Sequence, residues 1–302
     1  MNALSQRSSD TTPLIPVLAI VGLGLIGGSF AAALKAAGGA GRILGVGRQP
    51  DTLSRAQSLR LIDQAVTLEQ ALEQADVVML ATPVGAIRSL LETMQPLLRK
   101  DTIVTDAGST KFDVVTAARA VLGSKLSQFV PGHPIAGAEQ VGPESADANL
   151  FRDRNVVLTP LDETSDDALS RITAAWQLCG ARVLNMAPDI HDTVLASVSH
   201  VPHFLSSVFM WQVATAEDSD LRLSLAGSGF RDFTRISAGS PEVWRDIFLA
   251  NRTAVLTELD QVRHALTQAE QALQAGDGPA LLDFLERAAL ARRFWGSRSG
   301  LS

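Results

Sequence analysis

Four short clusters of polar residues hold the groups of this chain that could move a proton or bind an anion. They are Asp106-Ala-Gly-Ser109-Thr-Lys111, Gly132-His133-Pro134-Ile-Ala-Gly137-Ala-Glu139, His191-Asp192 with Ser199-His200-Val-Pro-His203, and Gly229-Phe-Arg231-Asp232-Phe-Thr-Arg235. An imidazole accepts or donates a proton near neutral pH, and a guanidinium binds a carboxylate through two parallel hydrogen bonds. These residue types favour acid–base chemistry on a small anion, but their spacing alone gives none of them a role.

The strongest single motif is a glycine-rich turn within residues 17–29, VLAIVGLGLIGGS. An apolar strand leads into Gly22, Gly24 and Gly27, and an Ala- and Leu-rich helical pattern follows, which is typical of a dinucleotide-binding βαβ unit. Gly22 permits the turn, Gly24 lets the backbone approach a pyrophosphate, and Gly27 lets helix and strand pack closely. Backbone at Leu25 and Ile26 would then meet the phosphates at the helix N-terminus. The alternative is a structural turn without a ligand.

The residues after the second strand favour NADP over NAD. In NAD-binding units an Asp or Glu about 20 residues past the glycines holds the ribose 2′-hydroxyl. No acidic residue occurs here from Ser29 to Pro50, and Arg48 follows the strand instead. A guanidinium would pair with a 2′-phosphate, although Arg48 could also stack on adenine while both cofactors bind. Thr82 and Pro83, just after another apolar strand, are further candidate cofactor contacts.

Composition narrows the class of protein. The chain has 302 residues, 46% hydrophobic and 19% charged, with a net charge of −6, which argues against nucleic acid or an anionic membrane as a partner. Its single cysteine, Cys179, excludes an internal disulfide and a cysteine-based metal cluster. Residues 11–34 carry no charge, but two prolines and four glycines interrupt them, so we expect no membrane segment and a cytoplasmic protein.

The first half of the chain alternates strands with helices. After a polar tail, residues 1–13, strands are expected at residues 17–21, 42–47, 77–81, 103–105 and 156–159, with a weaker candidate at 181–184. Continuous apolar strands between amphipathic helices indicate a parallel sheet covered on both faces. We therefore expect a Rossmann-type dinucleotide-binding domain over residues 14–186.

The second half, residues 187–302, is expected to be all-helical. One helix should span residues 189–216 with a bend near Pro202. A second should start at Ser240-Pro241 and continue through Leu273, and a third should return after the break at residues 276–279. The apolar positions of the second helix alternate steps of four and three residues, as in a coiled-coil seam. We expect this helical domain to bind substrate and to form a homodimer.

Taken together, the motifs GxGxxGGS, DAGSTK, GHPIAG, HDxxxAxxSHxPH and GFRDFTRI resemble those of the prephenate and arogenate dehydrogenases of tyrosine biosynthesis. The resemblance extends from Val17 to about Arg293. It implies oxidative decarboxylation of a cyclohexadienyl ring that carries a hydroxyl at C4 and a carboxylate at C1, with hydride transfer to NADP or NAD. Prephenate and arogenate differ only in a side-chain keto group or ammonium, and we expect both to be used.

The resemblance also assigns site residues. It implies that His133 accepts the proton of the C4 hydroxyl, that Ser109 hydrogen-bonds the substrate and this histidine, and that Arg235 binds a substrate carboxylate. By itself Ser109 could equally be a helix cap, and Arg235 could pair with Asp232. His203, Glu139 and Trp244 match residues around the substrate's side chain, and His191 matches a histidine farther from the chemistry.

Two other functions and one other kind of site remain open at this point. A β-hydroxyacid or imine-type dehydrogenase would share the domain order, but residues 188–225 lack the lysine expected of it. A non-enzymatic NADP sensor would need neither His133 nor Arg235. His191, His200 and His203 could suggest a metal, but they lack a clear further ligand, so we expect none. Because the sequence stops soon after the last expected helix, we expect inhibition by tyrosine to act at the active site.

Overall fold

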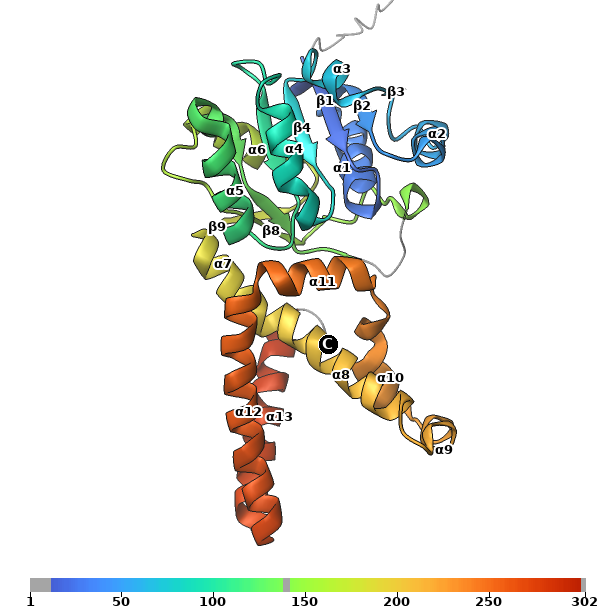
Figure 1. Cartoon of the computed structure of the whole chain (residues 1–302), viewed down its shortest axis with the longest axis vertical. Helices are drawn as coiled ribbons and strands as arrows, with labels where there is room; N and C mark the ends of the chain where they lie inside the picture. The colour runs from blue at the N-terminus through green and yellow to red at the C-terminus, as the bar shows by residue number, and fades with distance from the viewer. Residues whose placement is uncertain (1–11, 138–141, 300–302) are drawn as a thin grey trace, which may run out of the picture. The chain divides into compact units, whose positions relative to one another are not determined.

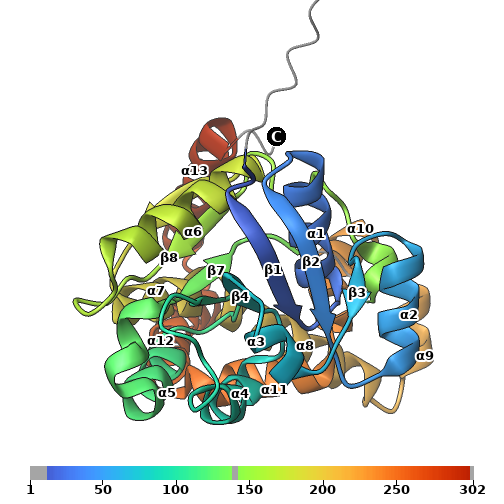
Figure 2. The same ribbon diagram turned by 90° about the horizontal axis from the view of Figure 1, so that it is seen from above.

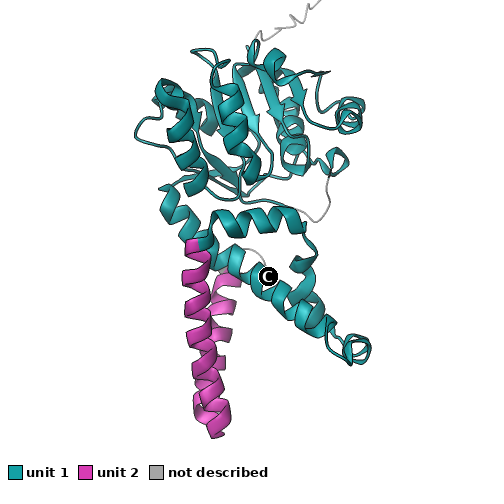
Figure 3. Cartoon of the chain, viewed as in Figure 1, with its two compact units in different colours: residues 1–252 teal, residues 253–302 magenta. Residues whose placement is uncertain are grey.

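The structure is a computed structural model that describes residues 12–137 and 142–299. These residues form two compact units, 1–252 and 253–302 (Figure 3), and each is described by itself. The predicted tail lies almost entirely outside the described residues. The predicted change of architecture near residue 186 falls within the first unit, and the domain boundary placed there stays a prediction.

The first unit begins with alternating strands and helices (Figure 1). In chain order they are β1 (Ile15–Val21), α1 (Leu25–Ala36), β2 (Ala40–Val46), α2 (Pro50–Ser58), β3 (Gln64–Ala65), α3 (Leu68–Leu72), β4 (Val77–Leu80), α4 (Ile87–Met94), β5 (Ile103–Asp106), α5 (Phe112–Leu122), β6 (Phe129–Val130), β7 (Gly132–Pro134), β8 (Asn155–Leu158), α6 (Asp166–Leu178) and β9 (Arg182–Asn185).

Six of these strands form one parallel sheet in the order β3-β2-β1-β4-β5-β6. The order reverses between β1 and β4, which is the topological switch point at which such sheets bind ligands. Figure 2 shows β1 and β2 side by side, with β4 beside β1 and β3 beside β2. The parallel sheet and the dinucleotide-binding architecture predicted from sequence are confirmed.

The core lies on both faces of this sheet because successive side chains of a strand point to opposite sides. Leu18 and Ile20 of β1 pack in one buried cluster with side chains of α1, α2 and α6. Ala19 and Val21 pack in the other cluster with α3, α4 and α5. Burial on both faces explains why the central strands β1 and β4 consist almost entirely of apolar residues.

The last two strands depart from the prediction. β8 and β9 do not extend the main sheet but form a second sheet in the order β7-β8-β9, in which β7 and β8 are antiparallel. The chain leaves the main sheet at Pro131, which has no N–H to donate, and the Pro131 carbonyl accepts from Thr159 N at 2.9 Å. β7, which carries His133, was not predicted as a strand.

Helices make up the rest of the first unit. They are α7 (Pro188–Leu195), a π-helical turn (Ala196–His200), α8 (Val201–Ala214), α9 (Ser219–Ser224), α10 (Ser228–Thr234), a 3₁₀ turn (Arg235–Ala238) and α11 (Pro241–Ala250). In the place of the simple bend predicted near Pro202, the π-helical turn precedes this proline, and Val201 N donates to the Ala196 carbonyl five residues back. Ser240 caps α11 and Pro241 opens it, as predicted.

The helical run Pro188–Ala214 is long and apolar enough, by length and composition, to cross a membrane. The core helix of a soluble protein passes the same test. Here the run carries buried polar side chains, among them His191, Asp192 and His200, that hydrogen-bond to other parts of the first unit. These hydrogen bonds join one face of the run to the first unit, whereas Val198 and Trp211 on the same run are more than half exposed.

The second unit contains α12 (Arg252–Ala275) and α13 (Gly278–Ser299), joined by a turn at Gly276 with φ of +63°. The single helix predicted from Ser240 to Leu273 is wrong, because α11 ends at Ala250. The next residue, Asn251, has a buried side chain that hydrogen-bonds to the Asp192 carbonyl and contacts His200. Among the described residues, the apolar side chains of α12 and α13 are largely exposed: Leu266, Leu273, Leu285 and Leu290 are each more than half exposed.

Candidate active site

The turn after β1 excludes side chains at two of its three glycines. Gly22 has φ of +100°, and a Cβ there would lie 2.5 Å from the Ala81 carbonyl oxygen. A Cβ on Gly27 would lie 2.1 Å from the Gly22 carbonyl oxygen. Both positions therefore require glycine, for the turn and for the close packing of α1 against β1 and β4, as the motif predicts.

The same turn fits the pyrophosphate of NAD(P). A Cβ on Gly24 would meet nothing within 4 Å, so a ligand can approach the backbone there. α1 begins at Leu25 and Ile26 with no side-chain cap and no acid in its first turn, which leaves its N–H groups to an anion. Thr82, next to Pro83 after β4, has a buried hydroxyl with no hydrogen-bond partner among the described residues. The predicted contacts of these residues with a cofactor stay predictions.

Arg48 lies two residues beyond β2, at the same edge of the sheet. Its side chain is exposed, and none of the residues that the structure describes forms an ion pair or hydrogen bond with its guanidinium. It is therefore available to a 2′-phosphate, as the sequence predicts, and the preference for NADP stays a prediction.

A buried ion pair fixes the two loops that carry Ser109 and His133. The Asp106 carboxylate, at the end of β5, binds the Lys111 ammonium, and both side chains are fully buried. The same carboxylate accepts from Gly108 N at 2.7 Å and from Gly132 N at 3.1 Å. Because Gly108 precedes Ser109 and Gly132 precedes His133, one carboxylate brings the serine loop beside the histidine strand.

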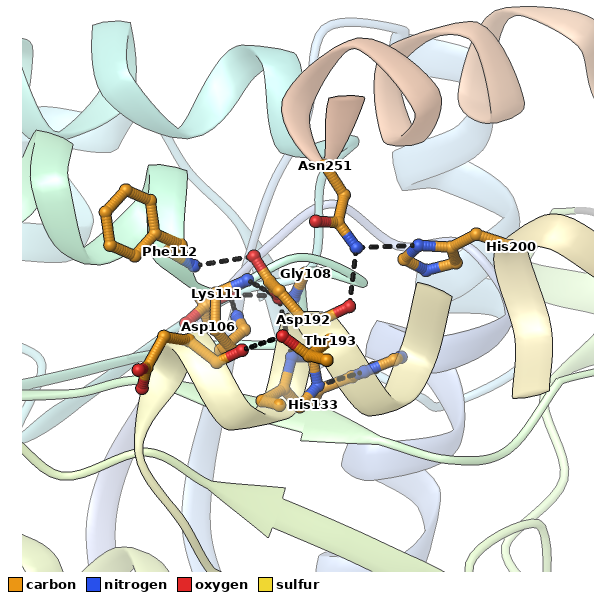
Figure 4. A network of polar contacts seen from close by, with 11 residues as sticks. Asp106, Gly108, Lys111, Phe112, His133, Asp192, Thr193, His200 and Asn251 are labelled. Atoms are coloured by element: carbon orange, nitrogen blue, oxygen red, sulfur yellow. Dashed lines mark hydrogen bonds and ion pairs between the residues drawn. The ribbon is translucent and has the colours of Figure 1, made fainter. Parts of the chain in front are cut away.

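His133 is the first of three polar side chains linked in series. Its Nδ1 lies 2.9 Å from Nε2 of His191, and Nδ1 of His191 lies 2.7 Å from Oδ1 of Asp192. His191 and Asp192 are buried, whereas His133 is partly exposed. Figure 4 shows His133 and Asp192 within this network. The sequence placed His191 far from the chemistry, but the structure places it in direct contact with His133.

Asp192 has a second partner that sequence reasoning missed. Its Oδ1 accepts from Lys111 N at 2.8 Å and its Oδ2 accepts from Phe112 N at 3.0 Å, at the start of α5 (Figure 4). The Asp192 carboxylate therefore accepts from the first N–H groups of α5, the role that a capping Ser109 would have had. Ser109 does not cap this helix. Contacts between residues 80 positions apart leave no local signal beyond the His-Asp pair itself.

Burial favours the neutral form of His133. Burial lowers the pKa of His133 well below its usual value, and the positive charge of Lys111 lowers it further. Burial alone would raise the pKa of Asp192, but hydrogen bonds from His191 and from the Phe112 and Lys111 N–H groups hold it below its usual value. A neutral imidazole beside an ionised carboxylate can act as a hydrogen-bond acceptor for a substrate hydroxyl.

A second group of aromatic side chains continues from this network. Asn251 donates from Nδ2 to the Asp192 carbonyl at 2.7 Å and lies 3.1 Å from Nδ1 of His200. His203 stacks on Trp244 with ring centroids 3.5 Å apart, and both line a cleft of about 480 Å³. Burial lowers the pKa of both His200 and His203 to about 4. The structure thus connects the predicted substrate residues His203 and Trp244 to the His133 network through Asn251 and His200.

The two remaining predicted substrate residues are Arg235 and Glu139. Arg235 is exposed and opens the 3₁₀ turn that contains Ser237, which lines the same cleft as His203. Glu139 lies outside the described residues. Within the described part of the chain, no three His, Cys, Asp or Glu side chains are grouped to hold a metal ion. His191, His200 and His203 each have a different partner: a carboxylate, an amide and an indole ring.

Comparisons with known proteins bear on this arrangement. A family model of the prephenate dehydrogenase nucleotide-binding domain matches residues 30–185, and a model of the prephenate dehydrogenase dimerization domain matches residues 187–287. A cyclohexadienyl dehydrogenase of Zymomonas mobilis is 36% identical over 280 residues, covering 91% of this chain and 94% of that protein.

Solved structures give the same picture. The prephenate dehydrogenase of Aquifex aeolicus, in complex with hydroxyphenyl propionate and NAD+, superimposes with a TM-score of 0.87 at 34% identity, over 92% of this chain and 97% of that one. The Synechocystis arogenate dehydrogenase superimposes with a TM-score of 0.79 at 31% identity, over 92% of this chain and 99% of that one.

Proposed function

The chain belongs to the prephenate dehydrogenase family, and we propose that it catalyses the oxidative decarboxylation of prephenate, arogenate or both in tyrosine biosynthesis. The products would be 4-hydroxyphenylpyruvate and tyrosine. The observation that carries the proposal is the His133 imidazole, held at the carboxyl edge of a dinucleotide-binding sheet by the carboxylate that also anchors the Ser109 loop.

Each proposed site residue has its own role in this reaction. His133 accepts the proton of the C4 hydroxyl, and Ser109 hydrogen-bonds the same oxygen. Arg235 binds a carboxylate of the substrate, while His203 and Trp244 contact its side chain. Bound NAD(P)+ supplies the acceptor for the hydride that leaves C4. When the bond from C1 to its carboxylate breaks, CO₂ leaves, the bonding electron pair completes the aromatic ring, and the C4 oxygen takes a proton back to form the phenol. Aromatisation makes the reaction strongly favourable. Glu139 would add an acidic contact to the substrate's side chain.

The substitution His133→Asn tests this assignment. Asn cannot take up the proton, so kcat should fall by roughly 10²–10⁴-fold, the usual contribution of a general base. The binding of NAD(P)+ should stay unchanged, because the cradle at Gly22–Gly27 is not altered. Turnover measured from nicotinamide absorbance and affinity measured by calorimetry give the two readouts. Wild-type turnover in His133→Asn would refute the role.

The cofactor is proposed to be NADP in preference to NAD. The support is the exposed Arg48 and the lack of an acid from Ser29 to Pro50. A hydrogen bond to a charged group contributes about 1.5–3 kcal/mol, so Arg48→Ala should weaken NADP+ binding by roughly 10- to 150-fold and leave NAD+ binding unchanged. Arg119→Ala, which removes an exposed arginine paired with Glu163, is the matched control. Equal affinity of the wild type for both cofactors would contradict the preference.

Both substrates are proposed to be used, because an imidazole such as His203 can accept from an ammonium or donate to a keto acid. Steady-state kinetics with each substrate tests this. A preference of about a thousandfold in kcat/KM, equal to about 4 kcal/mol of transition-state binding, would rule out dual use.

A cytoplasmic homodimer is proposed as the working form, with no nucleic acid or membrane partner. The support is the dimerization-domain match over residues 187–287 and the uncovered apolar side chains of α12 and α13. Light scattering should give twice the 32.0 kDa mass of one chain. In the double variant Leu266→Glu/Leu273→Glu the dimer should weaken, and a wild-type monomer at micromolar concentration would contradict the proposal.

A further inference from the structure

We propose that His191 and Asp192 fix the tautomer of His133, so that its Nε2 is unprotonated and available to the substrate while its Nδ1 carries the proton. Both act as positioning residues, since they touch His133 or each other rather than the substrate. The inference rests on the proposed function and adds two residues to which that function gives no role.

The argument starts from the Asp192 carboxylate, which can only accept. Its two oxygens face Lys111 N at 2.8 Å and Phe112 N at 3.0 Å, and a main-chain N–H cannot reverse its direction. The third partner, Nδ1 of His191, lies 2.7 Å from Oδ1 and must therefore donate. The proton of neutral His191 is thus on Nδ1.

The position of the proton on His191 then determines the position of the proton on His133. With its proton on Nδ1, neutral His191 has an unprotonated Nε2, which can only accept. Nδ1 of His133 lies 2.9 Å from that atom and must donate to it. Neutral His133 consequently has an unprotonated Nε2, which is the form needed to accept a hydroxyl proton.

Burial keeps water away from these hydrogen bonds. The His191 side chain is fully buried and that of Asp192 is 5% exposed, so water does not compete for their ring nitrogens and oxygens. The other polar groups packed nearby are already engaged. The Lys111 ammonium binds Asp106, and Asn251 donates to the Asp192 main-chain carbonyl and contacts His200. No neighbour in this network offers His191 an alternative partner for its Nδ1.

The series also stabilises the charged form of His133. When the substrate O–H bond breaks, its proton forms the new N–H bond at Nε2, and the ring becomes an imidazolium that still donates from Nδ1 to His191. The negative charge of Asp192 lies one ring away and favours this cation. The same division of roles, in which a carboxylate orients a histidine without taking its proton, operates in serine proteases.

Two substitutions at His191 separate orientation from packing. His191→Phe keeps the ring volume but removes the acceptor, so kcat should fall by about 10- to 100-fold, as for other groups that orient a functional imidazole. The KM for substrate and the affinity for NAD(P)+ should not change. His191→Gln offers a carbonyl oxygen to His133 Nδ1 and should recover most of the lost turnover. Thr193→Val, an exposed change on the same helix that removes only a hydrogen bond to the Asp189 carbonyl, is the control.

A spectroscopic measurement tests the tautomer without any turnover. The chain has only five histidines, so ¹⁵N-histidine NMR of the wild type can be assigned by single substitutions. At neutral pH His133 should show a protonated Nδ1 and an unprotonated Nε2, and in folded His191→Phe both tautomers should appear. Protonation of His133 at Nε2 in the wild type overturns the inference, as does wild-type kcat in His191→Phe. The expected tautomer in an enzyme inactive towards both substrates would instead overturn the proposed function.

Discussion

The buried ion pair between Lys111 and Asp106 gives the sharpest prediction on stability. Replacing Lys111 with Met keeps an unbranched chain of similar length and removes the ammonium. Asp106 would then be a fully buried carboxylate with only two donors, the N–H groups of Gly108 and Gly132. Breaking a buried pair by removing one partner costs about 3–5 kcal/mol, because the remaining charge is uncompensated. We expect Lys111→Met to lower the free energy of unfolding by that amount.

A second change on the same background isolates the charge. In Lys111→Met/Asp106→Asn neither member of the pair is charged, but the amide can accept from only one side, so one of the two main-chain N–H groups loses its acceptor. That loss costs about 1–3 kcal/mol. The double variant should therefore be more stable than Lys111→Met alone, although it contains one more substitution.

Urea unfolding at fixed protein concentration, followed by tryptophan fluorescence, measures both free energies. Turnover should fall in Lys111→Met as well, since Asp106 holds the loops of Ser109 and His133 together. A loss below about 1 kcal/mol in the single variant would refute the reasoning, because such values belong to exposed pairs. A double variant less stable than the single one would refute it equally.

Three further predictions follow from the glycines, the buried histidines and the exposed arginine. Gly27→Ala should lower the melting temperature and abolish NAD(P)+ binding, since its Cβ would meet the Gly22 carbonyl oxygen at 2.1 Å, whereas Gly24→Ala should fold normally and lose only cofactor affinity, as scanning fluorimetry and calorimetry can show. The pKa of His200 and of His203 is about 4 in the folded chain against about 6.5 unfolded, so the unfolded chain binds more protons between these values. The contribution of the two neutral histidines to the free energy of unfolding should be fully present above about pH 6.5 and should decline as the pH falls towards 4. A melting temperature that stays constant over this range would contradict the assignment. Arg235→Gln should mainly raise KM for substrate, since a carboxylate contact acts in the ground state as well as the transition state, and a change confined to kcat would count against it.

Much of the fold could be predicted because the signals were local. The central strands β1 and β4 of the main sheet are buried on both faces and are rich in apolar residues, and Ser240-Pro241 marks the start of α11 through its own cap. The errors arose where distant contacts decide. The break at Asn251 depends on its hydrogen bonds to Asp192 and His200, and the separate sheet of β7, β8 and β9 depends on where the chain turns at Pro131.

The site divides in the same way. The glycines of the cofactor turn were predictable because their conformation is set by neighbours within a few residues and by the strand before them. The role of Asp192 was not, because its partners Lys111 and Phe112 lie about 80 positions earlier in the chain. His191 was underestimated for the same reason, since its contact with His133 spans 58 positions.

The π-helical turn at Ala196–His200 makes chain length, rather than residue type, critical in this segment. Each residue of an α-helix advances about 100° around the axis. Removing one residue from the turn would restore α-helical winding and rotate His200 and His203 by about 100° relative to His191 and Asp192. Many replacements at the solvent-facing Val198 should be harmless, whereas a one-residue deletion would move His200 and His203, which are now buried as His191 is. The extra residue thus sets the direction in which His200 and His203 point around the helix axis relative to His191 and Asp192.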